Sequence, residues 1–331
     1  MSVVASCAPA VSLLLLTHNQ ERIARAAARA CLAQTGAPLE IILSDDASND
    51  GTFGELQAAA AGYTGPHRVR VRRNAVNLGI GAHFNRLLEE ASGELLVTAA
   101  GDDVSLPNRV ERLVQAWDRS ERRADLIASH FVDMTRDGAL VRPVQTDDLG
   151  ACTLASWLDR IPHSVGATHA FTRRMMARFG GFIDGICYED RIMVLRALCG
   201  GGAITVREPL VHYRRGGTSS GRRAQTAEHV LQWHRARNRL RLAEVRQMVL
   251  DARFAGCGDE VEAALAGVLA RERYREQMLD ADDAAARLRL LLTRSRGVPL
   301  GWRVRKFVAL SAPAQAAAFR RVQERLFGRR Y

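Results

Sequence analysis

The chain has 331 residues, of which 47% are hydrophobic and 25% are charged. This is the composition of an ordinary globular protein. The length suits one large α/β domain, or one domain with an appendage, and it allows a sizeable buried core. The six cysteines are scattered without a C-x-x-C pair, which argues against a zinc knuckle or a disulfide framework and favours a reducing compartment.

The basic residues are unevenly distributed. Lys and Arg exceed Asp and Glu by 11, and the whole excess follows residue 220, where 23 basic residues accompany 12 acidic ones. This asymmetry predicts a domain at 1–220 and a basic region at 221–331. The basic region is expected to have an acidic partner: an anionic membrane, a nucleic acid or a polyanionic glycan.

Short apolar runs alternate with segments of helical spacing in the first hundred residues. Strands are expected at residues 11–16, 39–43, 69–71 and 95–99, and helices at 21–34, 52–61 and 83–91. This alternation predicts βαβ units and a mostly parallel sheet. After residue 220 the pattern is mainly helical. Residues 11–16 are too few to cross a bilayer and lack the basic start of a signal peptide, so we expect the protein in the cytoplasm.

Polar residues directly follow three of these strands: Thr17, His18 and Asn19; Asp45 and Asp46; Asp102 and Asp103. In parallel sheets, ligands bind beyond the carboxyl ends of the strands. The three clusters are therefore expected to converge on one cleft.

The acidic pairs have both functional and structural interpretations. Asp102 and Asp103 could hold Mg²⁺ together with substrate phosphates, or could form a turn with a helix cap. Asp45 and Asp46 could equally lie in a solvated turn. Glu189 and Asp190 precede an apolar helical run at 192–198, where they could cap the helix or supply a general base. His212 could be a metal ligand, or simply a histidine at a strand end.

Several motifs occur in a fixed order and resemble the family 2 glycosyltransferases, which have the GT-A fold. In chain order they are Thr17-His18-Asn19, Gln34, residues 39–52, Asn77-Leu78-Gly79, Asn85, Ser92-Gly93-Glu94, Gly101-Asp102-Asp103 with Pro107, and Glu189-Asp190. The resemblance covers about residues 9–220. The ordered set is specific, although each motif alone is weak.

The resemblance implies a GT-A catalytic domain with a helical C-terminal appendage, and an inverting transfer from a nucleotide-diphosphate-sugar donor to an acceptor hydroxyl. It assigns Asp190 as the base, with Glu189 in support, and Asp103 as a ligand of Mg²⁺ or Mn²⁺; His212 is a second candidate ligand. Residues expected to bind the donor are Thr17, His18, Asn19, Asp45, Asp46, Asn77, Gly79 and Asp102. The expected acceptor is a glycan or a lipid-linked glycan of the cell envelope.

The chain departs from the family pattern at three places. Many members have an aromatic residue at the position of His18. Many have Ala-Arg where this chain has His83-Phe84, and Ala100 replaces the third acid of the longer Asp-x-Asp-Asp form. The absent arginine removes an expected diphosphate contact. The candidates to replace it are Arg86, Arg109 and Arg214.

The basic C-terminal region leaves alternatives open. Residues 316–330 place apolar and arginine side chains at helical spacing. This segment could lie on the anionic inner face of the cytoplasmic membrane, or could pack as an ordinary helix. A nucleotidyltransferase and a non-enzymatic binder of polyanions are the competing hypotheses for the whole chain. No nucleic-acid motif is recognisable, and no nucleic-acid partner is expected.

Overall fold

The computed structural model describes residues 10–216, 227–313 and 315. Nine strands form one sheet: β1 (Val11–Thr17), β2 (Glu40–Asp45), β3 (Arg68–Arg73), β4 (Leu95–Ala100), β5 (Val104–Ser105), β6 (Leu126–Met134), β7 (Leu140–Val144), β8 (Ala170–Thr172) and β9 (Ala203–Arg214). The helices of the first two thirds are α1 (Glu21–Leu32), α2 (Thr52–Ala60), α3 (Ile80–Glu90), α4 (Arg109–Arg119), α5 (Leu154–Asp159), α6 (Arg173–Phe179) and α7 (Asp190–Leu198). Two 3-10 turns, η1 (Leu149–Ala151) and η2 (Gly166–Thr168), lie between them.

The sheet has a parallel half and a mixed half. Its strand order is β3-β2-β1-β4-β8-β6-β9-β5, and β7 pairs with β6. The first four strands are parallel, β8 is antiparallel to both its neighbours, and β9 is parallel to β6. The expected parallel arrangement thus describes the N-terminal half, whereas β8 reverses the direction in the centre. The four expected strands and three expected helices correspond to β1–β4 and α1–α3 within a few residues.

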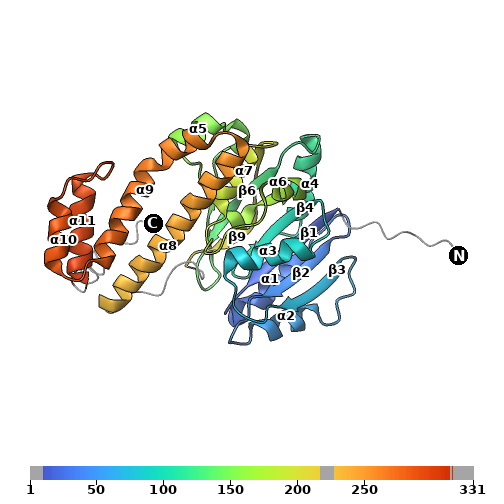
Figure 1. The fold of residues 1–331 in the computed structure, drawn as a ribbon. Coiled ribbons are helices and arrows are strands. Elements are labelled where there is room, and N and C mark those ends of the chain that lie inside the picture. Colours follow the sequence, from blue (N-terminus) through green and yellow to red (C-terminus); the bar gives the residue numbers. More distant parts are fainter. Residues whose placement is uncertain (1–9, 217–226, 314, 316–331) are drawn as a thin grey trace.

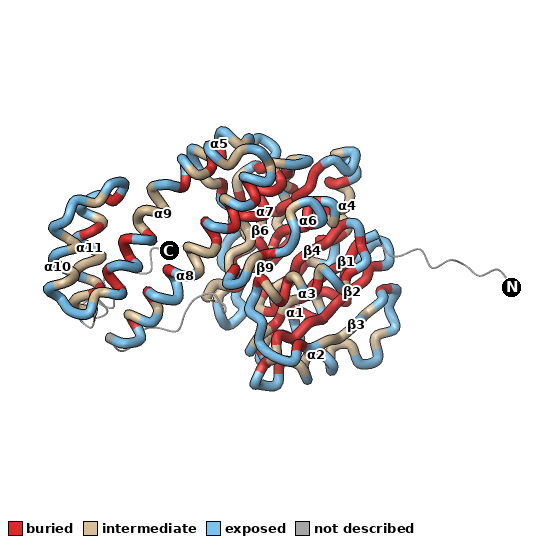
Figure 2. Tube along the Cα trace, in the orientation of Figure 1, coloured by how far each residue is buried: buried red, intermediate tan, exposed pale blue. Residues whose placement is uncertain are grey.

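Alternation along the strands divides the core between the two faces of the sheet. Leu13 and Leu15 of β1 face α1, α2 and α4, where Trp117 is fully buried. Leu14, between them, faces the other side, where α3, α6 and α7 pack. Successive side chains of a strand point to opposite faces, so a six-residue apolar run can serve both cores. Figure 2 shows that strands β1, β2 and β4 are mostly buried.

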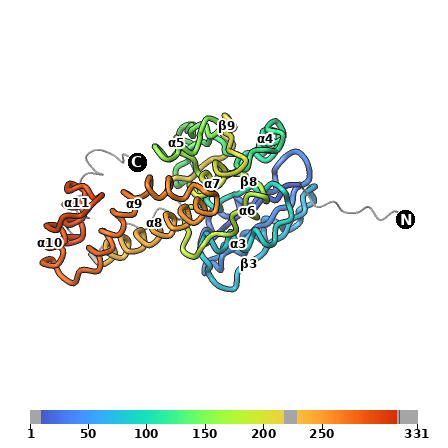
Figure 3. Tube along the Cα trace, turned by 45° about the horizontal axis from the view of Figure 1, so that its top comes forward, coloured from blue at the N-terminus to red at the C-terminus, as the bar shows by residue number. Residues whose placement is uncertain are grey.

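Two long helices, α8 (Ala227–Ala255) and α9 (Gly258–Asp280), form a hairpin that projects from the sheet domain (Figures 1 and 3). Its turn packs into the core on the α7 side through Val245, Met248 and Val261. Arg196 of α7 and Asp251 of α8 form a buried ion pair there, with N···O distances of 2.6 and 3.1 Å. The division expected at residue 220 stays a prediction, but this half of the hairpin shares the core of the preceding domain.

The far end of the hairpin carries α10 (Ala284–Leu292) and α11 (Leu300–Ser311) (Figure 1). A separate small core fills this end, with Tyr274, Met278, Leu279, Val298 and Leu310 buried. Among the described residues, no helix combines the length and the apolarity that a membrane crossing requires.

Candidate active site

The carboxyl ends of three parallel strands lie side by side. In the register of the sheet, Thr17 pairs with Asp45, and Leu16 pairs with Ala100. The polar residues that follow β1, β2 and β4 therefore start at one edge of the sheet. Gly101 permits this close approach, because a Cβ there would lie 2.6 Å from Cγ2 of Thr17.

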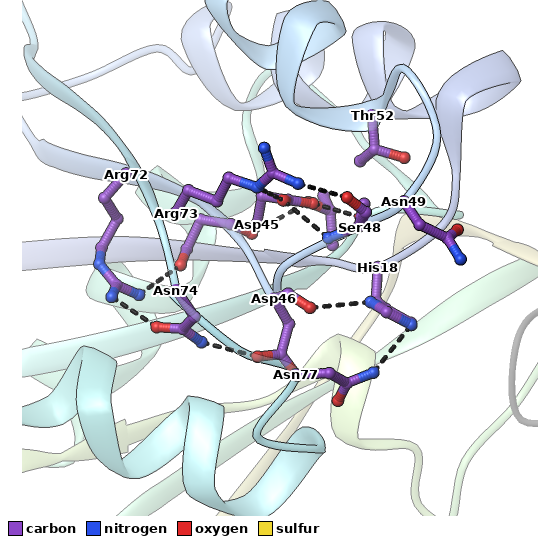
Figure 4. A network of polar contacts seen from close by, with 12 residues as sticks. His18, Asp45, Asp46, Ser48, Asn49, Thr52, Arg72, Arg73, Asn74 and Asn77 are labelled. Carbon is purple, nitrogen blue, oxygen red and sulfur yellow. Dashed lines mark hydrogen bonds and ion pairs between the residues drawn. The ribbon is translucent and has the colours of Figure 1, made fainter.

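Asp46 holds the loop between β3 and α3. Its Oδ1 accepts hydrogen bonds from Nδ2 of Asn74 at 2.7 Å and from the amide of Leu78 at 2.9 Å. Its Oδ2 accepts from the amide of Gly79 at 2.9 Å. The carboxylate is buried, and these three donors satisfy it within the protein. Asp46 thus holds in place the loop of Asn77 and Gly79, which forms one wall of the site at this edge of the sheet; Figure 4 shows Asp46 and Asn77.

The His18 ring bridges the same loops. Its Nδ1 lies 2.9 Å from the carbonyl oxygen of Asp46, which can only accept, so Nδ1 carries the proton. Nε2 must then accept, and the Nδ2 groups of Asn77 and Asn19 lie 2.9 and 3.0 Å away. These contacts fix the plane of a half-buried ring beside an exposed loop (Figure 4).

Asp45 is fully buried and is bonded within the protein. It accepts from the amide of Ser48 at 3.0 Å and from the Ser48 hydroxyl, and it pairs with Nε of Arg73 at 3.1 Å. The carboxylate closes a turn in which Ala47 has a φ of 53°. Its predicted contact with the donor stays a prediction; the described contacts give it the role of holding this turn.

Asp102 and Asp103 follow β4, and β9 holds the second of them. Oδ1 of Asp103 accepts a 2.7 Å hydrogen bond from the amide of Arg214, and the Arg214 guanidinium donates to the carbonyl oxygen of Asp102 at 2.9 Å. Burial raises the pKa of Asp103 well above its ordinary value, and the neighbouring Asp102 raises it further. The fold therefore brings two carboxylates together at a site that disfavours their negative charge.

This pair fits a divalent cation that is shared with a substrate. A cation would offset the charge that burial disfavours at Asp103, and Mg²⁺ commonly uses one or two carboxylates with substrate phosphates. Within the described part of the chain, no group of three or more Asp, Glu, His or Cys residues could hold a metal alone. His212 pairs with Val104 in the β5–β9 ladder and does not complete such a group. Its role as a ligand stays a prediction.

Glu189 and Asp190 lie at the start of α7, where the helix dipole favours negative charge. Burial, followed by the neighbouring Asp190, raises the pKa of Glu189 to about 7. Burial also raises the pKa of Asp190, although the Arg191 amide donates to its Oδ1 at 2.9 Å. The carboxylate of Glu189 packs directly on Gly166, where a Cβ would collide with Oε1.

Tyr213 connects the two acidic pairs. Burial raises the pKa of its hydroxyl to about 12, and Asp103, Asp102 and Asp190 raise it as well. All three carboxylates are therefore close enough to act electrostatically on one phenol. A second link passes through β4: the Thr98 hydroxyl donates to the carbonyl oxygen of Gly166 at 2.8 Å, and Gly166 contacts Glu189. The site thus combines a polar wall, an acidic pair suited to a cation, and a second acidic pair of raised pKa.

Residues 12–175 match the model of Glycosyl transferase family 2. The chain belongs to this family. The match contains the residues that follow β1, β2 and β4, and ends before Glu189 and Asp190. Its catalytic domain is a glycosyltransferase domain, as the ordered motifs predicted.

Two curated relatives show the extent of the similarity. Putative glycosyltransferase EpsE of Bacillus subtilis is 35% identical over 106 residues, which cover 32% of this chain and 37% of EpsE. An uncharacterized protein of Mycobacterium tuberculosis is 28% identical over 218 residues, covering 55% of this chain and 62% of the relative. These matches therefore span less than two thirds of either relative.

Solved structures show the same fold over nearly the whole chain. Staphylococcus aureus TarS 1-349 in complex with UDP-GlcNAc has a TM-score of 0.54 at 14% identity, covering 94% of this chain and 91% of that one. The mannosyltransferase PcManGT of Pyrobaculum calidifontis, in complex with GDP-Man and Mn²⁺, has a TM-score of 0.52 at 16% identity, covering 96% and 88%. The predicted GT-A architecture with C-terminal helices is confirmed.

The departure from the family pattern at residues 83–84 has a structural explanation. Phe84 is buried, and its ring centroid lies 5.3 Å from those of Phe171 and Phe182. The side chain of Asn85 forms two 2.8 Å hydrogen bonds with the backbone of Phe182. Helix α3 therefore uses these positions to hold the loop that leads to α7, and an arginine at 84 would bury a charge in the core.

The three arginines considered for the diphosphate are engaged elsewhere. Arg86 pairs with Glu89 and Glu90 on the outer face of α3. Arg109 is fully buried and donates to the carbonyl oxygens of Thr98 and Ala167, both at 2.8 Å. The guanidinium of Arg214 donates to three backbone carbonyls, those of Asp102, Thr135 and Arg136. None of the three presents an unengaged guanidinium to a diphosphate in the described structure.

The sequence analysis did not identify Tyr213, Gly166 or the Arg214 amide as parts of the site. They join it through strand pairing and packing across long stretches of chain, and no local motif marks them. The functional roles assigned to the predicted site residues stay predictions.

Proposed function

We propose that this protein transfers a sugar from a nucleotide-diphosphate-sugar donor to an acceptor hydroxyl, with inversion at the anomeric carbon, in the assembly of a cell-envelope glycan. The observation that carries the proposal is that the segments after β1, β2 and β4 meet at one edge of the sheet, where the Arg214 amide holds Asp103. The family match favours this interpretation over a nucleotidyltransferase or a non-enzymatic polyanion binder. TarS and PcManGT, of the same fold, are complexed with UDP-GlcNAc and GDP-Man.

In this proposal the donor lies along the wall made by the loops after β1, β2 and β3. Thr17, His18 and the loop of Asn77 and Gly79 contact the nucleoside, and Asp46 keeps that loop in place. His18 presents its ring beside this loop, where the ring offers a flat surface for stacking.

Asp102 and Asp103 would hold Mg²⁺ or Mn²⁺, which supplies charge neutralisation for the departing diphosphate. The Arg214 amide donates to Oδ1 of Asp103, which leaves Oδ2 as the oxygen available to the cation. Because the three considered arginines are engaged, the cation would supply the main positive charge at the diphosphate.

Asp190 accepts the proton of the acceptor hydroxyl as that oxygen attacks the anomeric carbon from the face opposite the diphosphate. A raised pKa makes its carboxylate a stronger base than an exposed aspartate. Glu189 lies beside it with a pKa of about 7, so at neutral pH a proton on Glu189 limits repulsion between the two groups.

The acceptor and the membrane partner are further parts of the proposal. A glycan or lipid-linked acceptor suits a protein located at the inner face of the cytoplasmic membrane. The segment 316–330, for which a helix on the membrane surface and an ordinary packed helix were the alternatives, lies outside the described residues.

The test is a thermal-shift and donor-hydrolysis screen of UDP-, GDP- and dTDP-sugars with Mg²⁺ or Mn²⁺. One nucleotide class is expected to stabilise the wild type only with metal, and Asp190→Asn is expected to retain that stabilisation while losing transfer to acceptor. Asp184→Asn is the matched control, since Asp184 is an exposed carboxylate of the same loop. Absence of any nucleotide response in the wild type would overturn the proposal.

A further inference from the structure

Helices α10 and α11 carry an exposed apolar surface. Leu288 and Leu292 are one turn apart on α10, as are Leu300, Val304 and Val308 on α11. All five are exposed, at 45%, 76%, 63%, 41% and 53% respectively. Residues four apart lie on one side of a helix, so each helix carries an apolar stripe. The two helices contact each other, and Leu292 and Leu300 flank the loop 293–299 that joins them.

Positive charge surrounds these stripes. Residues 281–313 contain seven Lys and Arg and two Asp, and no acidic residue occurs between 284 and 313. Arg289, Arg294, Arg296 and Arg305 are exposed, and within the described ranges none of them forms an ion pair. We call the five apolar residues and these four arginines the distal surface.

The inward-facing arginines of the same unit are satisfied by backbone carbonyls. Arg303 is buried and donates to the last carbonyls of α10, including that of Leu290 at 3.3 Å. Arg287 donates to the carbonyl oxygens of Met278 and Leu310 at 3.0 and 3.1 Å. These bonds, together with the small core below, fix α10 and α11 to α9. The helices that carry the distal surface are therefore held in a defined position on α9.

An open hollow adjoins Leu300. It has a volume of about 540 Å³ and is lined by Arg271, Pro299, Gly301, Trp302 and Arg305. Two guanidinium groups beside an indole suit the phosphate of a lipid headgroup, because guanidinium binds phosphate oxygens through paired donors and the indole prefers the membrane interface.

We propose that the distal surface binds the face of an anionic phospholipid membrane, with a headgroup phosphate in the hollow. Branched apolar side chains ringed by arginines are the composition of surfaces that lie in the membrane interface. A second copy of the chain is a poorer occupant, since pairing two such surfaces would bring their unpaired arginines together. The proposal concerns residues remote from the active site and does not depend on the proposed transfer reaction.

The experiment measures co-sedimentation of the full chain with phosphatidylcholine vesicles that contain or lack phosphatidylglycerol. Binding is expected only with phosphatidylglycerol, and it should weaken with salt. Leu292→Glu/Leu300→Glu should lower the partition constant at least tenfold, and each of Arg271→Ala, Arg294→Ala and Arg305→Ala should lower it about fivefold. Leu140→Glu/Leu250→Glu is the matched control, because it adds the same charge at exposed leucines elsewhere and should bind as the wild type.

Three outcomes would overturn the proposal. The wild type could fail to bind the anionic vesicles, or the Leu292→Glu/Leu300→Glu protein could bind as the control does, which would assign binding to another segment such as 316–331. Light scattering could instead show a dimer that only the Leu292→Glu/Leu300→Glu change dissociates, which would identify a second copy as the occupant. An unchanged melting temperature confirms that each variant is folded.

Discussion

The amide of Arg214 donates a 2.7 Å hydrogen bond to Oδ1 of Asp103, although 111 residues separate them in the chain. This bond ties the last residue of β9 to the acidic pair that follows β4. The position of the candidate metal ligand therefore depends on the mixed half of the sheet as well as on the parallel half.

Asp103→Asn tests the charge of this pair without removing the acceptor for the Arg214 amide. Since burial disfavours the ionised carboxylate, the variant without ligands should be more stable than the wild type, with a higher Tm. It should lose the metal-dependent stabilisation by nucleotide. Calorimetry with and without Mn²⁺ measures both effects; an undiminished metal response would remove Asp103 from the site.

Glu189→Gln should alter the pH dependence of stability. The pKa of Glu189 is about 7 in the folded protein against an ordinary 4.5, so between these values the folded state binds more protons than the unfolded state. The unfolding free energy should therefore fall as the pH rises from about 4.5 to about 7, by at most about 3 kcal/mol.

Urea unfolding at several pH values checks this slope. Glu189→Gln should flatten it, and Glu260→Gln, at an exposed glutamate, should leave it unchanged. Equal slopes in all three proteins would show that Glu189 titrates as an ordinary carboxyl.

Arg196→Met should destabilise the protein by about 3–5 kcal/mol, because it leaves the buried Asp251 carboxylate unpaired. Arg196→Met/Asp251→Leu should recover much of this loss. Arg253→Ala breaks the exposed pair with Glu262 and should cost about 1 kcal/mol or less. Equilibrium unfolding measures these losses of stability. Equal losses in Arg196→Met and Arg253→Ala would contradict the idea that burial makes the Arg196–Asp251 pair more important than an exposed pair.

Asn85→Ala should lower kcat roughly tenfold to a hundredfold with little change in nucleotide affinity. The side chain holds the backbone of Phe182, in the loop that precedes Glu189 and Asp190, and small displacements of reacting groups are costly. Steady-state kinetics and nucleotide titration separate the two effects. Asn108→Ala, at an exposed asparagine, is the control; a weaker nucleotide affinity with unchanged kcat would place Asn85 on the donor side.

The sequence predicted those features that local patterns determine. Apolar runs gave β1 to β4, and the acids that follow them marked the carboxyl edge. Strand β8 could not be foreseen, because three residues, Ala170–Thr172, carry too little periodicity and owe their place to pairing with β4 and β6. Arg109 shows a related difficulty: a sequence cannot distinguish an arginine that binds phosphate from one buried among backbone carbonyls.

The α8–α9 hairpin also acts as a spacer of defined length. Helix α9 has 23 residues and so extends about 35 Å. The ion pair of Arg196 and Asp251 joins α8, near the turn of the hairpin, to α7, the helix that begins with Asp190. Helices α10 and α11 lie at the other end of the hairpin. If the far end of the hairpin were bound to a surface, the length of the hairpin would fix the distance between that surface and the active site. The hairpin would then select acceptors whose hydroxyl group lies at that distance from the surface.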